Sequence, residues 1–456
     1  MQLPRTSRSY WYEAGILFLA QFVLLLLTTP LYEIDTNSFI AGGFSWDIYH
    51  NPLLNLVIAA CRTLWPNVWF ILAVQLAVYA LCATLLIHEL FRDHRRFRYP
   101  ALALAAFEPL SLFYHFSLLS ESLFTSLTLL SVALLIRCLR QPNRRSALLF
   151  GLAMGLTFLS KLSSMTHLPL FGLLLFAPLP WGRRMLNLGA SLLPFTVCYL
   201  FVFIGQGIIN EGDLYTVEGR VRWDFSSSMY DPNAIDGPEF RRYVDPYIIR
   251  DGQLVANREL RRELSYLGYK DCVADYEAQG YSVNRGINRC DSIFGAVAAQ
   301  LMEQHFWAAE RQFIHDNVYF LHHLSYIDYR FTPGLHYYHP PAEYAYIDSL
   351  MRTTFDYDLS TRRDRIPALW TSLEFGNRYL PAWWYLWWVA LLGAAVLYLR
   401  NRHRRALLVL GTLTAIPLIF HLVYISYRAR FFAPYLVLVG LLVLHEIQIL
   451  LSPKAR

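Results

Sequence analysis

Long apolar runs alternate with short basic segments along most of this 456-residue chain. Clear examples are Ala14–Leu31, Val68–Leu90, Leu186–Ile204 and Phe432–Leu451. A helix of roughly 20 mostly apolar residues is long enough to cross the hydrocarbon core of a bilayer. The pattern therefore predicts an all-α polytopic membrane protein with about ten transmembrane helices.

The expected spans follow the apolar runs in order: 14–31, 67–91, 99–116, 122–138, 146–160, 165–180, 185–206, 380–399, 405–425 and 431–451. A further apolar run, Leu53–Leu64, is too short to span and carries Arg62. We expect it to form a juxtamembrane helix at the interface.

Three regions follow from these assignments. Residues 1–206 form a transmembrane module of seven helices, which includes a first external loop at 32–66. Residues 207–380 form one large, mostly helical external loop, and residues 381–456 carry the last three helices. A soluble domain is about 45–50% apolar, and this chain is 55% apolar, which agrees with a membrane class.

The net charge of +6 is concentrated in short clusters between the apolar runs. If every run crosses once, all these clusters fall on one side, which the positive-inside rule makes cytoplasmic. Both termini then lie inside the cell. The clustered residues are Arg5, Arg8, Arg92, Arg95, Arg96, Arg98, Arg137, Arg140, Arg144, Arg145, Arg183, Arg184, Arg400, Arg402, Arg404, Arg405, Lys454 and Arg456.

The long loop at 207–380 is net acidic, with 18 Lys and Arg against 25 Asp and Glu, which argues against nucleic-acid binding. Its length predicts internal structure. Asp213–Asp251 is expected to be irregular, whereas Asn257–Tyr269 and Ser292–Leu324 have helical apolar spacing. The aromatic stretch His305–Tyr346 either lines a sugar or lipid groove or rests on the membrane surface.

Two of the six cysteines, Cys272 and Cys290, fall in this external loop, where a disulfide can form. Their spacing leaves that pairing open. The remaining cysteines lie in or beside apolar runs and are expected to act as small hydrophobic residues.

Polar residues gather where the predicted topology places the external ends of the helices. The short external segments contain only four cations, and the positive-inside rule disfavours cations there, so each needs an explanation. These cations are Arg62, Lys161, Arg428 and Arg430. Acidic and other polar neighbours are Glu33, Asp35, Asp47, His50, His115, Ser120, Glu121 and Tyr427.

Carboxylates and cations at one membrane surface suit glycosyl transfer from a polyprenyl-phosphate sugar. The acceptor hydroxyl must lose a proton as it attacks the anomeric carbon, which a carboxylate base can accept. The departing phosphate develops charge that preorganised cations stabilise, and arginine can grip two of its oxygens. The lipid portion of the donor explains why such an enzyme sits in a membrane.

The order of several motifs resembles the glycosyltransferase C superfamily, which includes protein O-mannosyltransferases and lipid A aminoarabinose transferases. The resemblance covers about the first 180 residues and touches the last 30. The matching motifs are Glu33-Ile34-Asp35, His50-Asn51-Pro52-Leu53, Leu118-Leu119-Ser120-Glu121-Ser122-Leu123-Phe124, Phe158-Leu159-Ser160-Lys161 and Arg428-Ala429-Arg430-Phe431-Phe432-Ala433-Pro434.

The resemblance implies an inverting transferase with Asp35 as the catalytic base and Glu33 supporting it. Lys161, Arg428 and Arg430 would hold the donor phosphate. No cofactor is implied with certainty; a divalent metal, if used, would bind Glu33 and Asp35. Sequence departs from the family at Asn51, where proline is frequent, and at Glu108, within the predicted third helix.

Further residues are candidates for acceptor binding or support: His50, Asp47, Glu121 and Tyr427. Glu121 has a competing structural interpretation, because an acidic residue near a helix start caps it or interacts with its dipole. Glu108 would be buried at bilayer depth, where an ionisable residue is a functional suspect.

Two other functions stay open. A transporter or flippase for a lipid-linked or small molecule is suggested by the short fifth and sixth helices and by Glu108, although no internal repeat is seen. A noncatalytic scaffold is the third. The expected partners are the bilayer, a polyprenyl-phosphate sugar and an unidentified glycan, lipid or protein acceptor. High arginine and only three lysines indicate a GC-rich bacterial source. The expected location is therefore a bacterial inner membrane, with the active site facing the periplasm.

Overall fold

The computed structural model describes residues 8–27, 39–40, 51–209, 218–233, 235–256, 258–322, 349–356, 381–400, 404–423 and 433–451. It divides into two compact units. The bundle unit comprises Met1–Val202, Leu321–Leu418 and Arg428–Arg456, and the loop unit comprises Phe203–Phe320 and Ile419–Tyr427.

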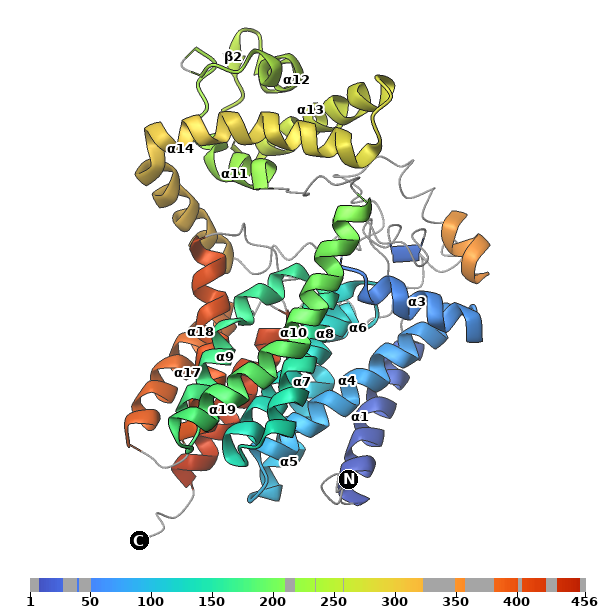
Figure 1. Cartoon of the computed structure of the whole chain (residues 1–456), viewed down its shortest axis with the longest axis vertical. Helices are drawn as coiled ribbons and strands as arrows, with labels where there is room; N and C mark the ends of the chain where they lie inside the picture. Colours follow the sequence, from blue (N-terminus) through green and yellow to red (C-terminus); the bar gives the residue numbers. More distant parts are fainter. Residues whose placement is uncertain are drawn as a thin grey trace. The chain divides into compact units, whose positions relative to one another are not determined.

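The bundle unit is built from helices (Figure 1). Two of them, α10 and α18, extend past its boundaries. The helices are α1 (Arg8–Leu27), α3 (Leu53–Leu64), α4 (Val68–Leu90), α5 (Arg98–Phe107), α6 (Pro109–His115), α7 (Ser120–Arg140), α8 (Arg144–Ser160), α9 (Pro169–Gly172), α10 (Trp181–Ile209), α17 (Pro381–Arg400), α18 (Arg404–Val423) and α19 (Ala433–Leu451).

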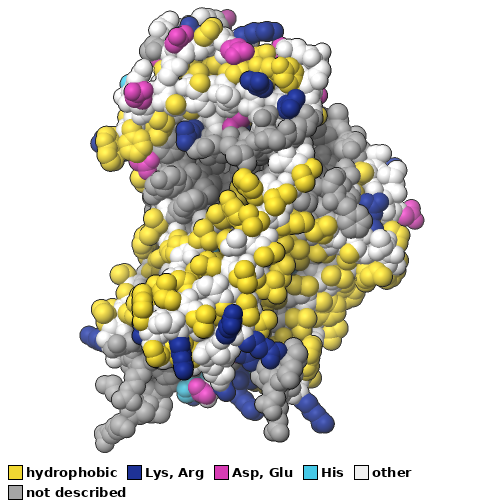
Figure 2. All heavy atoms as spheres, viewed as in Figure 1, with side chains coloured by type: hydrophobic (Ala, Val, Ile, Leu, Met, Phe, Trp, Pro, Cys, Tyr) yellow, Lys and Arg dark blue, Asp and Glu magenta, His cyan; other side chains and the backbone are white. Residues whose placement is uncertain are grey.

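Among the described residues, four helices are long and apolar enough to cross a membrane: α1, α4, α7 and the Trp181–Gly205 part of α10. The predicted helical membrane class is therefore confirmed, as is the helix at Leu53–Leu64. The expectation of about ten crossings with both termini inside stays a prediction. Figure 2 shows apolar side chains covering the bundle helices, with Lys and Arg gathered at the end where α1 begins.

Helix α7 forms the centre of the bundle unit, where it packs against α4 on one side and α8 on another. Within the apolar window of α7, 83% of the residues are buried, against 22% for α10. Helix α10 instead exposes a long row of large apolar side chains, as expected of a helix that faces lipid. The side chains that α7 presents therefore shape the interior of the unit.

The predicted third span at 99–116 is not one helix but two, because Glu108 interrupts it between α5 and α6. The residue before a proline avoids the helical region, and Glu108 has φ −65° and ψ 117° before Pro109. Pro109 also lacks the N–H that would bond the Ala105 carbonyl. That carbonyl instead accepts from the Tyr79 hydroxyl at 2.9 Å and from Gln21 Nε2 at 3.2 Å.

The expectation that Glu108 lies inside a continuous helix is therefore wrong. Its carboxylate Oε2 accepts from the Ser111 backbone N–H at 2.6 Å, at the start of α6. This satisfies one of the donors that a helix start leaves open. Capping thus gives the buried Glu108 a structural role.

The predicted sixth span at 165–180 is helical but broken into three pieces. A 3-10 helix at Leu162–His167 is followed by α9 and by a second 3-10 helix at Leu173–Phe176. Pro169 stands at the first position of α9, where a proline is tolerated because that N–H needs no helical partner. The chain after Lys161 therefore turns repeatedly rather than continuing as a regular helix.

A close contact between glycine and backbone joins α8 to α10. A Cβ built on Gly151 would lie 1.8 Å from the Ser191 carbonyl oxygen, and one on Gly155 would lie 2.7 Å from Cys198 Sγ. Only glycine lets the two backbones approach this closely, as is common where membrane helices pack.

The loop unit contains α11 (Glu218–Ser226), α12 (Pro238–Ile248), α13 (Arg258–Ala278) and α14 (Val283–His322), with a two-stranded hairpin of β1 (Ile249–Arg250) and β2 (Gln253–Leu254). Its two predicted helices are confirmed by α13 and α14. The expectation that Asp213–Asp251 is irregular is wrong where α11 and α12 form. Asp251 and Gly252 both have positive φ, as a two-residue hairpin turn with Asp-Gly requires.

Aromatic side chains form the core of the loop unit. The Phe240 ring lies 4.5 Å from that of Trp223 and 4.9 Å from that of Phe294, and Trp223 Nε1 donates to Ser265 Oγ at 2.9 Å. At the edge of this core, burial and a hydrogen bond to Asp245 raise the pKa of Tyr230 above its ordinary value.

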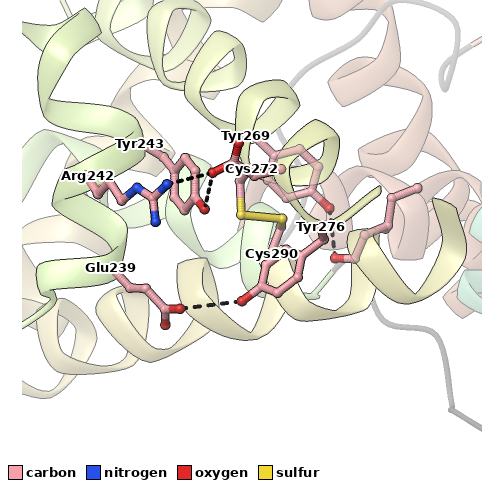
Figure 3. The surroundings of a disulfide bond; sticks show 9 residues. Glu239, Arg242, Tyr243, Tyr269, Cys272, Tyr276 and Cys290 are labelled. Carbon is pink, nitrogen blue, oxygen red and sulfur yellow. Dashed lines mark hydrogen bonds and ion pairs between the residues drawn. A yellow bond between two sulfur atoms is a disulfide. The ribbon is translucent and has the colours of Figure 1, made fainter. Parts of the chain in front are cut away.

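The Cys272–Cys290 disulfide, left open by the sequence, is present and joins α13 to α14 (Figure 3). Both cysteines are fully buried. Arg242 and Tyr243 of α12 both donate to the Asp275 carboxylate of α13. These bonds attach α12 to the disulfide-linked helices α13 and α14.

We predict that Gly151→Ala destabilises the protein by about 1–3 kcal/mol, because the new methyl group collides with the Ser191 carbonyl. Gly189→Ala is the matched control, since a Cβ there meets nothing within 4 Å. In a helix that change is expected to be neutral or stabilising. Thermal unfolding in detergent measures both, and equal stability of the two variants would refute the close packing.

We predict that Cys272→Ser/Cys290→Ser lowers the stability of the loop unit by roughly 3 kcal/mol, given the 18-residue separation of the two cysteines. The measurement is protection of residues 258–322 from limited proteolysis in the full chain. Cys198→Ala, which removes a free cysteine, serves as the control. Unchanged protection in the double variant would show that the bond contributes nothing.

Candidate functional site

The structure describes two of the predicted site residues, Lys161 and Glu121, and brings them together. The other seven lie outside the described residues: Glu33, Asp35, Asp47, His50, Tyr427, Arg428 and Arg430. Their roles stay predictions. The site is built here from Lys161, Glu121 and the described side chains around them.

Lys161 follows the last residue of α8 and has an extended backbone, with φ −161° and ψ 134°. This conformation ends the helix and directs the chain into the turns at Leu162–His167. The Lys161 ammonium donates to Glu121 Oε1 at 2.6 Å, which joins the end of α8 to the first turn of α7. The pair spans 40 residues of sequence and closes the α7–α8 hairpin.

The Lys161–Glu121 pair is largely removed from solvent, with the side chains 12% and 3% exposed. Two charges out of water lose hydration, and their attraction offsets this loss only when the geometry is good. An ion pair between apolar helices is thus costly to keep, which makes it a candidate for function.

Glu121 was also expected to act as a helix cap. The N-cap residue of α7 is Leu119, whose side chain makes no capping bond. Glu121 lies in the first turn, where its charge still complements the helix dipole. Its Oε2 also accepts from the Ser120 hydroxyl at 3.4 Å. Its shortest described side-chain contact, however, is the one to Lys161.

Asn51, which lies two residues before α3, makes a hydrogen bond close to this pair. Its buried side-chain amide donates to the carbonyl of Phe158, three residues before Lys161. Asn51 therefore ties the beginning of α3 to the last turn of α8. His50, the neighbouring residue in the chain, belongs to the same motif. The departure from proline at position 51 thus supplies a hydrogen bond that proline could not make.

Two buried side chains, Gln75 and His115, bond residues on either side of Glu121 in the sequence. Gln75 Nε2 donates to the Leu119 carbonyl at 3.5 Å, and His115 Nδ1 is bonded to Ser122 Oγ at 2.9 Å. The His115 ring also lies 3.9 Å from the ring of Tyr79. Among the described residues, Gln75 Oε1 and His115 Nε2 have no hydrogen-bond partner. The first turn of α7 is therefore held by its neighbours on both sides.

Aromatic side chains extend from the ion pair into the bundle. The Lys161 ammonium lies 5.8 Å from the centroid of the Phe124 ring, within cation–π range. The Phe124 ring is also stacked on the His167 ring, at 5.6 Å between centroids and nearly parallel. His167 Nε2 is hydrogen bonded to the Tyr435 hydroxyl at 2.8 Å.

Sequence reasoning missed His167 and Tyr435. A histidine in an apolar run and a tyrosine near a helix start are individually common, and nothing in the sequence pairs residues 268 positions apart. The signal that was available is that both lie close to motif residues, His167 after Lys161 and Tyr435 after Pro434.

The described residues contain no group of three His, Cys, Asp or Glu side chains able to hold a metal ion. The proposed metal ligands Glu33 and Asp35 lie outside that part of the chain. Chemically, the described site offers a largely buried cation paired with a carboxylate. Such a cation can bind an oxyanion such as a phosphate.

No protein-family model and no curated protein matches this chain. Among solved structures, it is similar to ArnT from Cupriavidus metallidurans bound to undecaprenyl phosphate. The two share 12% sequence identity, the match covers 96% of this chain and 78% of that one, and the TM-score is 0.32. At that level of similarity, activity and ligand must be judged from the residues themselves.

Proposed function

We propose that this protein is a membrane glycosyltransferase that transfers a sugar from a polyprenyl-phosphate donor to an acceptor at the extracytoplasmic face. The observation that carries the proposal is the buried Lys161–Glu121 pair, at the meeting of two helix ends. The order of motifs along the chain supports it. The proposed location is a bacterial inner membrane, with the site facing the periplasm.

Lys161 holds the donor phosphate in this proposal, together with Arg428 and Arg430. Without donor, Glu121 neutralises Lys161 and keeps a buried cation from standing alone. When the donor enters, a phosphate oxygen replaces the carboxylate as the partner of Lys161. Glu121 stays in the site with its hydrogen bond from the Ser120 hydroxyl, and Arg428 and Arg430 offset the added negative charge. Electrostatic stabilisation then strengthens as the phosphate leaves with its full charge.

The reaction is a single displacement with inversion at the anomeric carbon. Asp35 accepts the proton of the acceptor hydroxyl as its oxygen attacks that carbon, and the bond to the phosphate oxygen breaks. The lipid phosphate departs with the electron pair. Glu33 orients Asp35, and His50, Asp47 and Tyr427 contribute to acceptor binding.

A transporter or flippase is the second candidate, because two structural breaks favour it. The chain is interrupted at Glu108 and again throughout Leu162–Phe176, and transporters use broken helices at their binding sites. Reconstituted vesicles distinguish the two. Translocation of a lipid-linked sugar without a covalent product would favour transport.

We predict that Asp35→Asn and Asp35→Ala lower kcat by roughly 10²–10⁴-fold, because the acceptor proton loses its base. The assay supplies purified protein with radiolabelled polyprenyl-phosphate sugars and a membrane extract as the acceptor source. Asp93→Asn, at an exposed position, is the control expected to retain turnover. Wild-type turnover in both Asp35 variants at normal expression would remove Asp35 as the base.

We predict that Lys161→Met destabilises the protein by about 3 kcal/mol, because it leaves Glu121 buried without its partner. The double variant Lys161→Met/Glu121→Gln removes both charges and is expected to recover most of that stability. It should nevertheless bind polyprenyl phosphate at least tenfold more weakly than the wild type, since the cation is gone.

Thermal unfolding and lipid-phosphate binding, measured on the same samples, separate the two roles of Lys161. If the double variant regained both stability and wild-type binding, the ion pair would be purely structural. Lys161 would then have no part in holding the donor.

A further inference from the structure

His167 and Tyr435 form a buried hydrogen bond that joins two distant segments of the bundle unit. The donor–acceptor distance is 2.8 Å, and each residue is 1% exposed. His167 ends the 3-10 helix that begins directly after Lys161, and Tyr435 lies in the first turn of α19. The bond therefore connects the turn after Lys161 to the beginning of the last helix.

The His167 ring is also stacked on Phe124, with an angle of 10° between the ring planes. Phe124 lies one turn after Glu121 on α7, and its ring receives the Lys161 ammonium at 5.8 Å. The Glu121 carboxylate and the Phe124 ring are therefore among the groups that restrain Lys161. His167 supports the second of these through its stacking contact with the Phe124 ring.

The Tyr435 end of this chain of contacts is fixed by α19 and α17. Helix α19 packs on α17, α7, α5 and α6, and the Trp387 ring of α17 lies 6.4 Å from the ring of Tyr435. Tyr435 thus belongs to a well-packed helix, which fixes the position of the hydroxyl that bonds His167. In the sequence, Arg430 precedes Tyr435 by only five residues.

We infer that His167 and Tyr435 are positioning residues for the donor-phosphate site. Tyr435 orients His167, His167 supports Phe124, and Phe124 keeps the Lys161 ammonium aligned for the phosphate once Glu121 releases it. The same hydrogen bond fixes the beginning of α19 relative to Lys161. This inference rests on the proposed function, because it assumes that Lys161 binds the donor phosphate.

The test measures the binding of undecaprenyl phosphate to the full chain in nanodiscs, with Tyr435→Phe as the main variant. This change removes one hydroxyl and keeps the ring. We expect the Kd for undecaprenyl phosphate to rise roughly 3–10-fold, as for loss of a coupled contact. With an active transfer assay, the donor KM should rise by a similar factor while kcat changes less than twofold.

His167→Phe separates the hydrogen bond from the ring stack, because it keeps an aromatic ring against Phe124. It should weaken binding as much as Tyr435→Phe does. The matched control is Tyr10→Phe, which removes a tyrosine hydroxyl bonded to the Leu81 carbonyl at 3.0 Å. Binding by the control is expected to match the wild type.

A double-mutant cycle shows whether the effect passes through Lys161. In the Lys161→Met/Glu121→Gln background, adding Tyr435→Phe should change the Kd less than twofold, because no ammonium is left to position. An equal fold-change in both backgrounds, or unchanged binding in Tyr435→Phe alone, would overturn the inference. Failure of the wild type to bind undecaprenyl phosphate at all would instead overturn the proposed function and, with it, this inference.

Discussion

The arrangement of the candidate site depends on one constraint: charged and polar groups inside an apolar helical bundle must find partners within the protein. The Lys161–Glu121 pair meets this constraint by joining the end of α8 to the start of α7. The Ala105 carbonyl has no helical donor because Pro109 lacks an N–H, and it accepts from Tyr79 and Gln21 instead. Near the C-terminal end of α4, His88 Nε2 is hydrogen bonded to Glu13 Oε2 at 2.6 Å. Each such contact joins two segments of the bundle that are distant in sequence.

Under the proposed function, the same constraint explains how the bundle can keep a cation ready for a phosphate. A buried cation alone is strongly destabilising, so it needs an anion at all times. Glu121 supplies that anion from within the chain, and a phosphate from a lipid donor can take its place. Neighbouring residues hold the site at three places. Asn51 ties the beginning of α3 to α8, and Gln75 and His115 hold the beginning of α7. His167 with Tyr435 links the turn after Lys161 to α19.

Much of the fold could be predicted from hydrophobic runs, because helix length in a membrane is set by bilayer thickness. The bounds of α3, α4 and α8 agree closely with the apolar runs of the sequence. The breaks could not be predicted in this way. Hydropathy shows 99–116 as one apolar run and so predicts one helix. Steric restriction of the backbone before Pro109 divides that helix into α5 and α6. In the site, the predicted topology placed Lys161 and Glu121 at the same ends of the helices, so their proximity could be expected. The His167–Tyr435 bond depends on tertiary packing that no local sequence pattern reveals.

The most direct measurement is an experimental structure of the protein with undecaprenyl phosphate bound. The account requires the ammonium of Lys161 to contact a phosphate oxygen, with its bond to Glu121 lengthened or lost and the carboxylate of Asp35 opening onto the same cavity. A phosphate bound elsewhere, with Lys161 still paired to Glu121 and Asp35 remote from both, would contradict it.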